Sequence, residues 1–292
     1  MAQQSSKQRA EAEVLDLKGK LRQLNKALER KGAVVSENAP LVATIKAVEE
    51  MNAPAVTMTI FRSQQFFGFV DEILPPMRIA EEYKAANLSY CFGQSRTLKS
   101  LPNIENIDIA ANLSSLANSC QSLTDVSIGA LTNATDISSA FASCTSLTSV
   151  AIGAAPKVTN ALFLFSGCNR LKEVSIDLSG GLLGNFSYAF YSCLNLRRVT
   201  GIIDMSSATS VSSAFNGCSS LEEVRIKGLK VDLDLSACAN LSVESVRYLI
   251  DNAQAVSGKR IDLSRALLDA HEEELGDLGD TASDKGWTIN YK

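Results

Sequence analysis

Seven cysteines and one histidine are the residues of this 292-residue chain with the most direct capacity for chemistry. Cysteines that bind zinc usually occur as close pairs such as C-x-x-C, with a second cluster nearby. Six of the seven instead stand alone, 20 to 25 residues apart, at Cys120, Cys144, Cys168, Cys193, Cys218 and Cys238. Because a buried free cysteine acts as a small hydrophobic side chain, we expect these thiols to be packing residues. Disulfide bonds and metal ligation are the alternatives.

The histidine and its neighbours do not form a recognisable catalytic or metal motif. His271 precedes Glu272, Glu273 and Glu274, but these acids lack the D-x-D-x-D-G spacing of a calcium loop, so we expect a solvated helix face. The glycines of residues 180–184 lack the lysine of a phosphate-binding loop and predict a turn. A catalytic triad can still assemble from residues distant in the sequence. We predict no catalytic residue, metal or cofactor, and therefore no enzyme.

The cysteines belong to a repeat, in which an aromatic residue precedes each cysteine by three positions and a leucine follows it by three. Four repeats carry the pattern in full: Phe141, Cys144 and Leu147; Phe165, Cys168 and Leu171; Phe190, Cys193 and Leu196; and Phe215, Cys218 and Leu221. Partial copies end at Leu98, Leu123 and Leu241, and Ser95 replaces the cysteine of the first. A repeat of 24 to 25 residues cannot bury its own apolar face, so it must stack on further copies. The chain is predicted to form a solenoid.

Each leucine is followed by a short alternating segment such as Val150-x-Ile152, which predicts a strand with an inward apolar face. Strands of successive coils would then pair in parallel. We predict an α/β solenoid, a right-handed leucine-rich-repeat stack of about seven coils over residues 89–241, with one continuous parallel sheet. Residues 242–292 form the C-terminal cap, with a helix capped by Ser242, strands at 261–263 and 287–289, and an acidic helix between these strands.

The N-terminal residues predict a different element. Residues 1–52 read as helices, the first of which carries an apolar seam of Val14, Leu17, Leu21, Leu24 and Leu28 at coiled-coil spacing. Two heptads are short for a stable coiled coil, so the seam either forms an oligomer, docks on another protein or belongs to a larger bundle. Residues 53–88 are a connector with a strand near residues 56–61.

Composition limits the partners. The net charge of −4 disfavours nucleic acid as the main partner. No apolar run reaches the roughly 18 residues of a membrane helix, and the N-terminus shows no apolar signal segment, so we expect neither membrane insertion nor secretion. Residues 111–168 hold only Asp125, Asp136 and Lys157 as charged positions. This stretch predicts a nearly neutral polar surface suited to hydrogen bonding, or else a spine of small residues that lets the coils stack.

The repeats resemble the leucine-rich repeats of the Bacteroides surface protein A type, whose core is A/M-F-x-x-C-x-x-L-x-x-V/L. Residues 139–147 (SAFASCTSL) and 213–221 (SAFNGCSSL) match this core closely. The resemblance covers about half of the chain and implies the solenoid fold. It is less specific for function, since such repeats occur in adhesins, protist surface proteins and phage particles.

The ends of the chain resemble parts of phage proteins. Residues 31–35 (KGAVV), between two predicted helices, are similar to the attachment segment of tail and fibre proteins from phages of gut Bacteroidetes, and residues 285–289 (KGWTI) are similar to a cap found there. The resemblance implies a virion structural protein, assembled in the host cytoplasm. It would be a homo-oligomer, with a trimer favoured, which binds other virion proteins through its helices and a host-surface glycan or protein through its repeats. The alternative is a bacterial cell-surface adhesin, or a scaffold for a protein partner.

Overall fold

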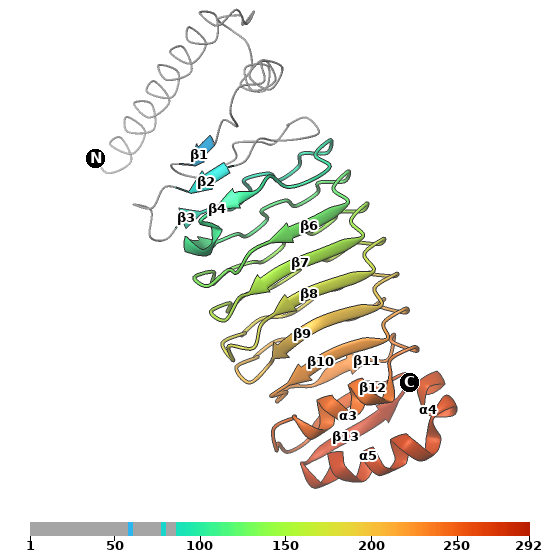
Figure 1. The fold of residues 1–292 in the computed structure, drawn as a ribbon. Coiled ribbons are helices and arrows are strands. Elements are labelled where there is room, and N and C mark those ends of the chain that lie inside the picture. Colours follow the sequence, from blue (N-terminus) through green and yellow to red (C-terminus); the bar gives the residue numbers. More distant parts are fainter. Residues whose placement is uncertain (1–57, 61–76, 80–85) are drawn as a thin grey trace, which may run out of the picture. The chain divides into compact units, whose positions relative to one another are not determined.

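The computed structural model describes residues 58–60, 77–79 and 86–292 of the chain. Residues 59–292 belong to one compact unit. From residue 86 onward the chain winds into a stack of coils that ends in a small helical cap (Figure 1). The predicted seam, with Val14, Leu17, Leu21, Leu24 and Leu28, lies outside the described residues.

One side of the stack is a parallel sheet to which successive coils each contribute one strand. Its strands are β6 (Asp125–Ile128), β7 (Ser149–Ala154), β8 (Glu173–Asp177), β9 (Arg198–Asp204) and β10 (Glu223–Lys227). They are hydrogen-bonded in chain order, as Figure 1 shows. Every pairing is parallel.

The sheet forms because β-branched residues recur at one register position. A column of valines crosses all five strands, consisting of Val126, Val150, Val174, Val199 and Val224. All five side chains are buried. β-Branched residues suit a pleated surface that is buried on one face, so the valine column determines both the strand and its inward face.

The extra length of β9 is accommodated at a glycine. Gly201 has a φ of +95°, and a Cβ atom there would collide with the carbonyl oxygen of Ile176 in the neighbouring strand. The pairing of β9 with β10 also shifts between Val224 and Ile226. Glycine tolerates this backbone conformation and the close approach of a second chain segment. The buried residues therefore remain register partners on both sides of the shift, Val199 with Val224 and Ile203 with Ile226.

The prediction of one continuous sheet was wrong, because the described residues contain four sheets. Near the N-terminal end, β1 (Met58–Ile60), β2 (Met77–Ile79) and β4 (Ile104–Glu105) form a three-stranded sheet, and β3 (Ala86–Asn87) pairs with β5 (Ala110–Asn112), next to the short helix η1 (Ile107–Ile109). In the described part of the chain, the first coil contributes no strand to the main sheet and pairs with β6 through an isolated bridge, from Ser100 to Asp125. Pro102 follows closely, and proline cannot donate to a strand ladder.

The opposite side of each coil is a run of tight turns, which we call the turn side. Its backbone N–H groups alternate between two kinds of acceptor. The N–H of Ala140 donates within its own turn to the carbonyl of Ile137 at 3.2 Å, whereas the N–H of Phe141 donates to Leu164 of the next coil at 3.0 Å. The same alternation recurs in later coils. Coils are therefore hydrogen-bonded to one another on the turn side as well as in the sheet.

Aromatic rings fill the interior behind these turns. The rings of Phe141, Phe165, Phe190 and Phe215 form one stack, with successive centroids 5.7, 5.4 and 5.5 Å apart. All four side chains are buried. Because each ring contacts the ring of the neighbouring coil, the stack couples coils that are about 25 residues apart in the sequence.

The cysteines lie beside this stack and also bond between coils. The thiols of Cys168, Cys193 and Cys218 donate to the carbonyl oxygens of Phe141, Phe165 and Phe190 respectively, each at 3.1 Å. Cys120 and Cys144 make the same bond to the preceding coil, also at 3.1 Å, and Cys238 approaches Phe215 at 3.9 Å. Cysteine combines a small apolar volume with a weak donor, which accounts for its recurrence at this position.

The cap ends the stack with helices and a second parallel sheet. Helix α3 (Val243–Asp251) packs on β10, followed by β12 (Lys259–Leu263), α4 (Arg265–Ala270), α5 (Glu272–Asp284) and β13 (Trp287–Tyr291). β12 pairs with β13 and with β11 (Leu233–Leu235). The predicted cap helix after Ser242, the acidic helix and both predicted strands are confirmed.

Replacing Phe215 by alanine is expected to lower the free energy of unfolding by about 3 to 5 kcal/mol, because a phenyl ring leaves a packed stack. Denaturant titration followed by circular dichroism measures the change. The matched control is Phe163→Ala, which removes the same ring from an exposed position and should cost less than about 1 kcal/mol. Equal losses for the two variants would contradict the interior position of the stack.

Candidate functional site

The outward face of the main sheet presents side chains in regular columns, and we call it the sheet face. Its first column of side chains consists of Asp125, Ser149, Glu173, Arg198 and Glu223, which are direct register partners. The adjacent column consists of Ser127, Ala151, Ser175 and Thr200. These residues alternate with the buried valine column, so the strand geometry that builds the core also orients this surface.

Two hollows lie along the sheet face. The larger has a volume of about 530 Å³ and extends from Ser100 over β6, β7 and β8 to Arg198 and Thr200 on β9. The smaller, of about 390 Å³, lies between β9, β10 and helix α3. Arg198 lines both, so a ligand that spans the two hollows would contact this guanidinium.

The larger hollow begins in a polar region with little charge. Asp125 is its acidic residue on β6, and its carboxylate accepts hydrogen bonds from the hydroxyls of Ser149 at 2.6 Å and Thr148 at 3.1 Å. The hydrogen bond from Ser149 is the main reason why the pKa of Asp125 lies below its usual value. The carboxylate is therefore ionised and already oriented at neutral pH.

Charge increases toward the cap. On neighbouring strands, Arg198 lies 3.7 Å from Glu173, and Arg197 lies 2.7 Å from Glu222. These side chains are substantially exposed, and exposed ion pairs contribute little to folding stability. The neutral surface predicted from residues 111–168 thus covers only the β6 and β7 part of the sheet face, and alternating acids and bases occupy the rest.

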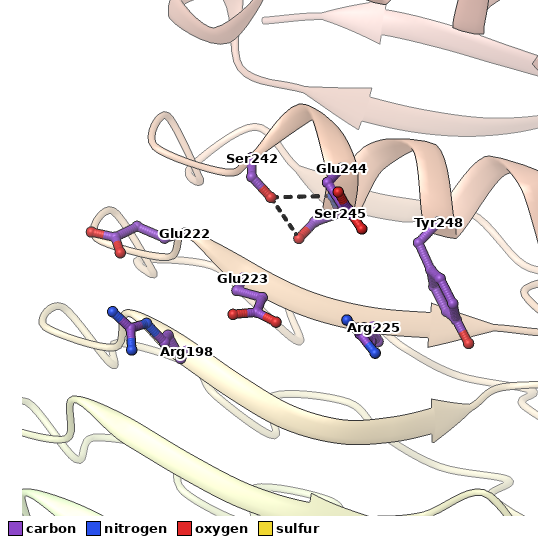
Figure 2. A pocket seen from close by; sticks show the side chains of 8 residues that line it. All are labelled: Arg198, Glu222, Glu223, Arg225, Ser242, Glu244, Ser245 and Tyr248. Atoms are coloured by element: carbon purple, nitrogen blue, oxygen red, sulfur yellow. Dashed lines mark hydrogen bonds between the residues drawn. The ribbon is translucent and has the colours of Figure 1, made fainter.

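Helix α3 forms one wall of the smaller hollow, at the edge where a further strand would pair (Figure 2). Ser242 caps the helix by accepting the Ser245 N–H at 3.2 Å. The Ser245 hydroxyl in turn accepts the N–H of Val224 in β10 at 3.2 Å. Capping side chains thereby satisfy both the helix end and part of the exposed strand edge.

An arginine and a tyrosine meet at the far end of this hollow. The guanidinium carbon of Arg225 lies 5.9 Å from the ring centroid of Tyr248, within the range of a cation–π contact. Figure 2 shows the side chains of Arg225 on β10 and Tyr248 on α3 beside one another. This pair combines a planar cation with an amphipathic aromatic ring, the residue types enriched at protein interfaces.

The predicted repeat-core residues all come together inside the stack. The structure buries Phe141, Cys144, Leu147, Phe165, Cys168, Leu171, Phe190, Cys193, Leu196, Phe215, Cys218 and Leu221. All seven cysteines are free thiols. Burial raises the pKa of Cys91, Cys120, Cys168 and Cys238 to about 12 and raises the pKa of the other three as well. Protonated, buried thiols are poor nucleophiles and poor metal ligands.

The other candidates from the sequence lie in the cap or in a turn. His271 is exposed at the start of α5, with its Nδ1 atom 2.9 Å from the carboxylate of Glu274. Residues 179–181 form a turn after β8 in which a Cβ on Gly180 would collide with Pro156 of the preceding coil. Within residues 58–60, 77–79 and 86–292, no group of three histidines, cysteines or acids could hold a metal ion.

The sequence analysis missed functional candidates that do not repeat. Arg198 and Arg225 occupy outward strand positions that vary from coil to coil, and their only sequence signal was alternation with buried valines and isoleucines. Tyr248 lies in the cap helix, outside the repeat, and carried no such signal. The sequence analysis also missed Phe92, which is buried and holds the aromatic position of the first coil, three residues before Ser95. The seventh cysteine, Cys91, is buried at the position that Ala140 holds in a later coil.

The stack defines a leucine-rich-repeat protein, a class whose solenoids are typical of protein binding or recognition. The profile described as "BspA type Leucine rich repeat region" matches six copies over residues 88–164 and 138–255, more than half of the chain. The chain therefore belongs to this family. No curated protein and no solved structure matches it significantly. No helix in the described part of the chain is long and apolar enough to cross a membrane.

Thiol labelling with Ellman's reagent at pH 8 should find seven reactive thiols in denaturant and almost none in the native protein, because burial keeps the thiols protonated. The variant Thr145→Cys serves as a positive control, since Thr145 is exposed next to Cys144. It should add one thiol that reacts quickly in the native state. Rapid labelling of several wild-type cysteines in the native protein would contradict the burial of these thiols.

Proposed function

We propose that the protein is a non-enzymatic recognition protein that binds a protein partner through the sheet face. The observation that carries this proposal is the position of Arg198, which lines both hollows on a surface built by five registered strands. The surface offers hydroxyls, carboxylates and guanidinium groups, which suit complementary polar contacts.

Charge and aromatic character favour a protein over a neutral glycan at this face. The part of the sheet face near the cap alternates Glu173, Arg198, Glu223 and Arg225. Such alternation selects a partner with the opposite charge pattern and rejects partners with mismatched charges. Arginine and tyrosine also dominate the binding energy at many protein interfaces, and here Arg225 and Tyr248 lie together at the edge of the hollow.

We further propose that the protein is a phage virion component, such as a tail or fibre protein, that presents the solenoid for attachment to a host. The similarity of residues 31–35 and 285–289 to phage proteins supports this role. Several copies held together by the N-terminal helices would strengthen weak individual contacts. A bacterial surface adhesin or a scaffold is the alternative, and a portal, capsid or tail gene next to this one would separate the two.

Reversing the charge of Arg198 and Arg225 together, as R198E and R225E, should reduce binding of the full chain to host Bacteroidetes cells at least tenfold and make the remaining binding less salt-dependent. Flow cytometry of the labelled protein measures this. The control R170E reverses an exposed arginine on the turn side and should leave binding unchanged. Equal binding by the double variant and wild type would contradict recognition through the sheet face.

Deleting residues 1–52 should convert an oligomer, with a trimer expected, into a monomer with an intact solenoid. Residues 59–292 form one compact unit, so the remaining chain is expected to fold. Sedimentation velocity gives the mass, and circular dichroism gives the fold. A truncated chain that still assembles fully would place the assembly surface elsewhere, and a monomeric full-length chain would contradict the homo-oligomer.

A further inference from the structure

A cluster of three aromatic side chains, two exposed and one half-buried, lies on the turn side, away from the sheet face. Phe163 and Tyr188, on successive coils, stack with ring centroids 4.8 Å apart and an interplanar angle of 20°. Tyr191 meets Tyr188 edge-on at 5.7 Å. Phe163 is 37% exposed and Tyr191 39% exposed. We call these three residues the aromatic platform.

The fold does not require aromatic residues at these positions. Phe163 and Tyr188 both have a φ of +56°, in the left-handed region that bulky residues rarely adopt. Serine occupies the equivalent position in three other coils, at Ser115, Ser139 and Ser213, and Tyr90 occupies it in the first coil, all with the same left-handed backbone. Since serine suffices for the turn, the exposed ring of Phe163 and the half-buried ring of Tyr188 occupy a strained backbone position that the turn itself does not require. Strain of this kind is concentrated at functional sites.

Small side chains hold the equivalent position in the coils on either side of the stack. Ser139 precedes Phe163 by one coil, and Ser213 follows Tyr188 by one coil. Adjacent coils bond directly at these positions, from Ser139 N–H to Leu162 and from Tyr188 N–H to Ser212. A serine side chain is much smaller than an aromatic ring. A flat ligand ring could therefore extend the stack at either end by one step.

The surroundings of the platform are polar but nearly uncharged. The turn segments of four successive coils, residues 137–147, 161–171, 186–196 and 211–221, contain a single charged residue, Arg170. Ser166 and Asn216 hold the position of Tyr191 in the coils on either side, and both are at least partly exposed. The platform thus combines flat apolar faces with neutral donors and acceptors.

We propose that the aromatic platform binds a neutral carbohydrate, with a pyranose ring stacked on Phe163 or Tyr188. The C–H-rich face of a pyranose carries partial positive charge, which complements the negative face of an aromatic ring. Hydroxyls of the sugar would bond to the serine and asparagine side chains around the platform. A single-stranded nucleic acid also stacks on aromatic rings, but it requires cations along its backbone, and Arg170 alone cannot supply them.

Affinity electrophoresis of the full chain through gels containing soluble polysaccharides tests this proposal. The neutral set is yeast mannan, laminarin, glycogen, arabinoxylan and galactomannan, and heparin and alginate form the acidic set. The double variant F163S/Y188S installs the residue that other coils carry at this position, so the fold should be retained. Leu182→Ser removes an apolar side chain that is 50% exposed just after the turn of residues 179–181 and serves as the matched control.

We expect at least one neutral polysaccharide to retard the wild type and L182S equally, and F163S/Y188S to bind it at least tenfold more weakly. Failure of every neutral polysaccharide to retard the wild type would overturn the proposal, as would retardation that the double variant retains. Binding to the acidic set alone, or loss of self-association in the double variant, would also overturn it by identifying a polyanion or a second copy as the occupant. The R198E/R225E variant should bind carbohydrate normally, which separates this site from the sheet face.

Discussion

Hydrogen bonding between successive coils is the constraint on which this structure depends. A single coil can pair only some of its own backbone N–H and C=O groups. The coils before and after it must therefore supply the remaining hydrogen-bond partners. The sheet does this on one side, and the alternating turns do it on the other. The cysteine thiols add a third set of contacts, because each lies where a small apolar side chain can also donate to the preceding coil. Phe, Cys and Leu therefore recur together, because each coil buries these three side chains at the same interior positions.

The same constraint explains the ends of the stack and the character of the sheet face. An open edge would expose unpaired strand groups, and helix α3 covers the edge of β10 while Ser245 accepts one of its N–H groups. The helix also carries Tyr248 toward Arg225 and so completes the smaller hollow. A feature required for stability at the cap thus creates a candidate binding surface. Variation is tolerated at outward positions because those side chains do not take part in stacking.

The repeating part of the fold could be predicted from spacing, because burial imposes the same residues on every coil. Phe141, Cys144 and Leu147 recur for this reason, and the strands follow from the inward valines. The division into several sheets could not be predicted from the repeat spacing, since it depends on local features outside the repeat, such as Pro102 after the bridge from Ser100 to Asp125. Arg198, Arg225 and the platform residues Phe163 and Tyr188 escaped prediction because each departs from the repeat. Their significance depends on which neighbours the fold brings beside them.

Native-state hydrogen exchange of the full chain, followed residue by residue with NMR, tests the central claim most directly. If the turn side bonds coils together as the sheet does, the amides of Phe165 and Phe190, which donate to Ala189 and Ala214 of the next coil, should exchange as slowly as the paired amides of β8. Protection in a cooperative protein reports the free energy of opening, so matched rates would show that both sides open together. Rapid exchange of the two phenylalanine amides beside a protected sheet would contradict this account.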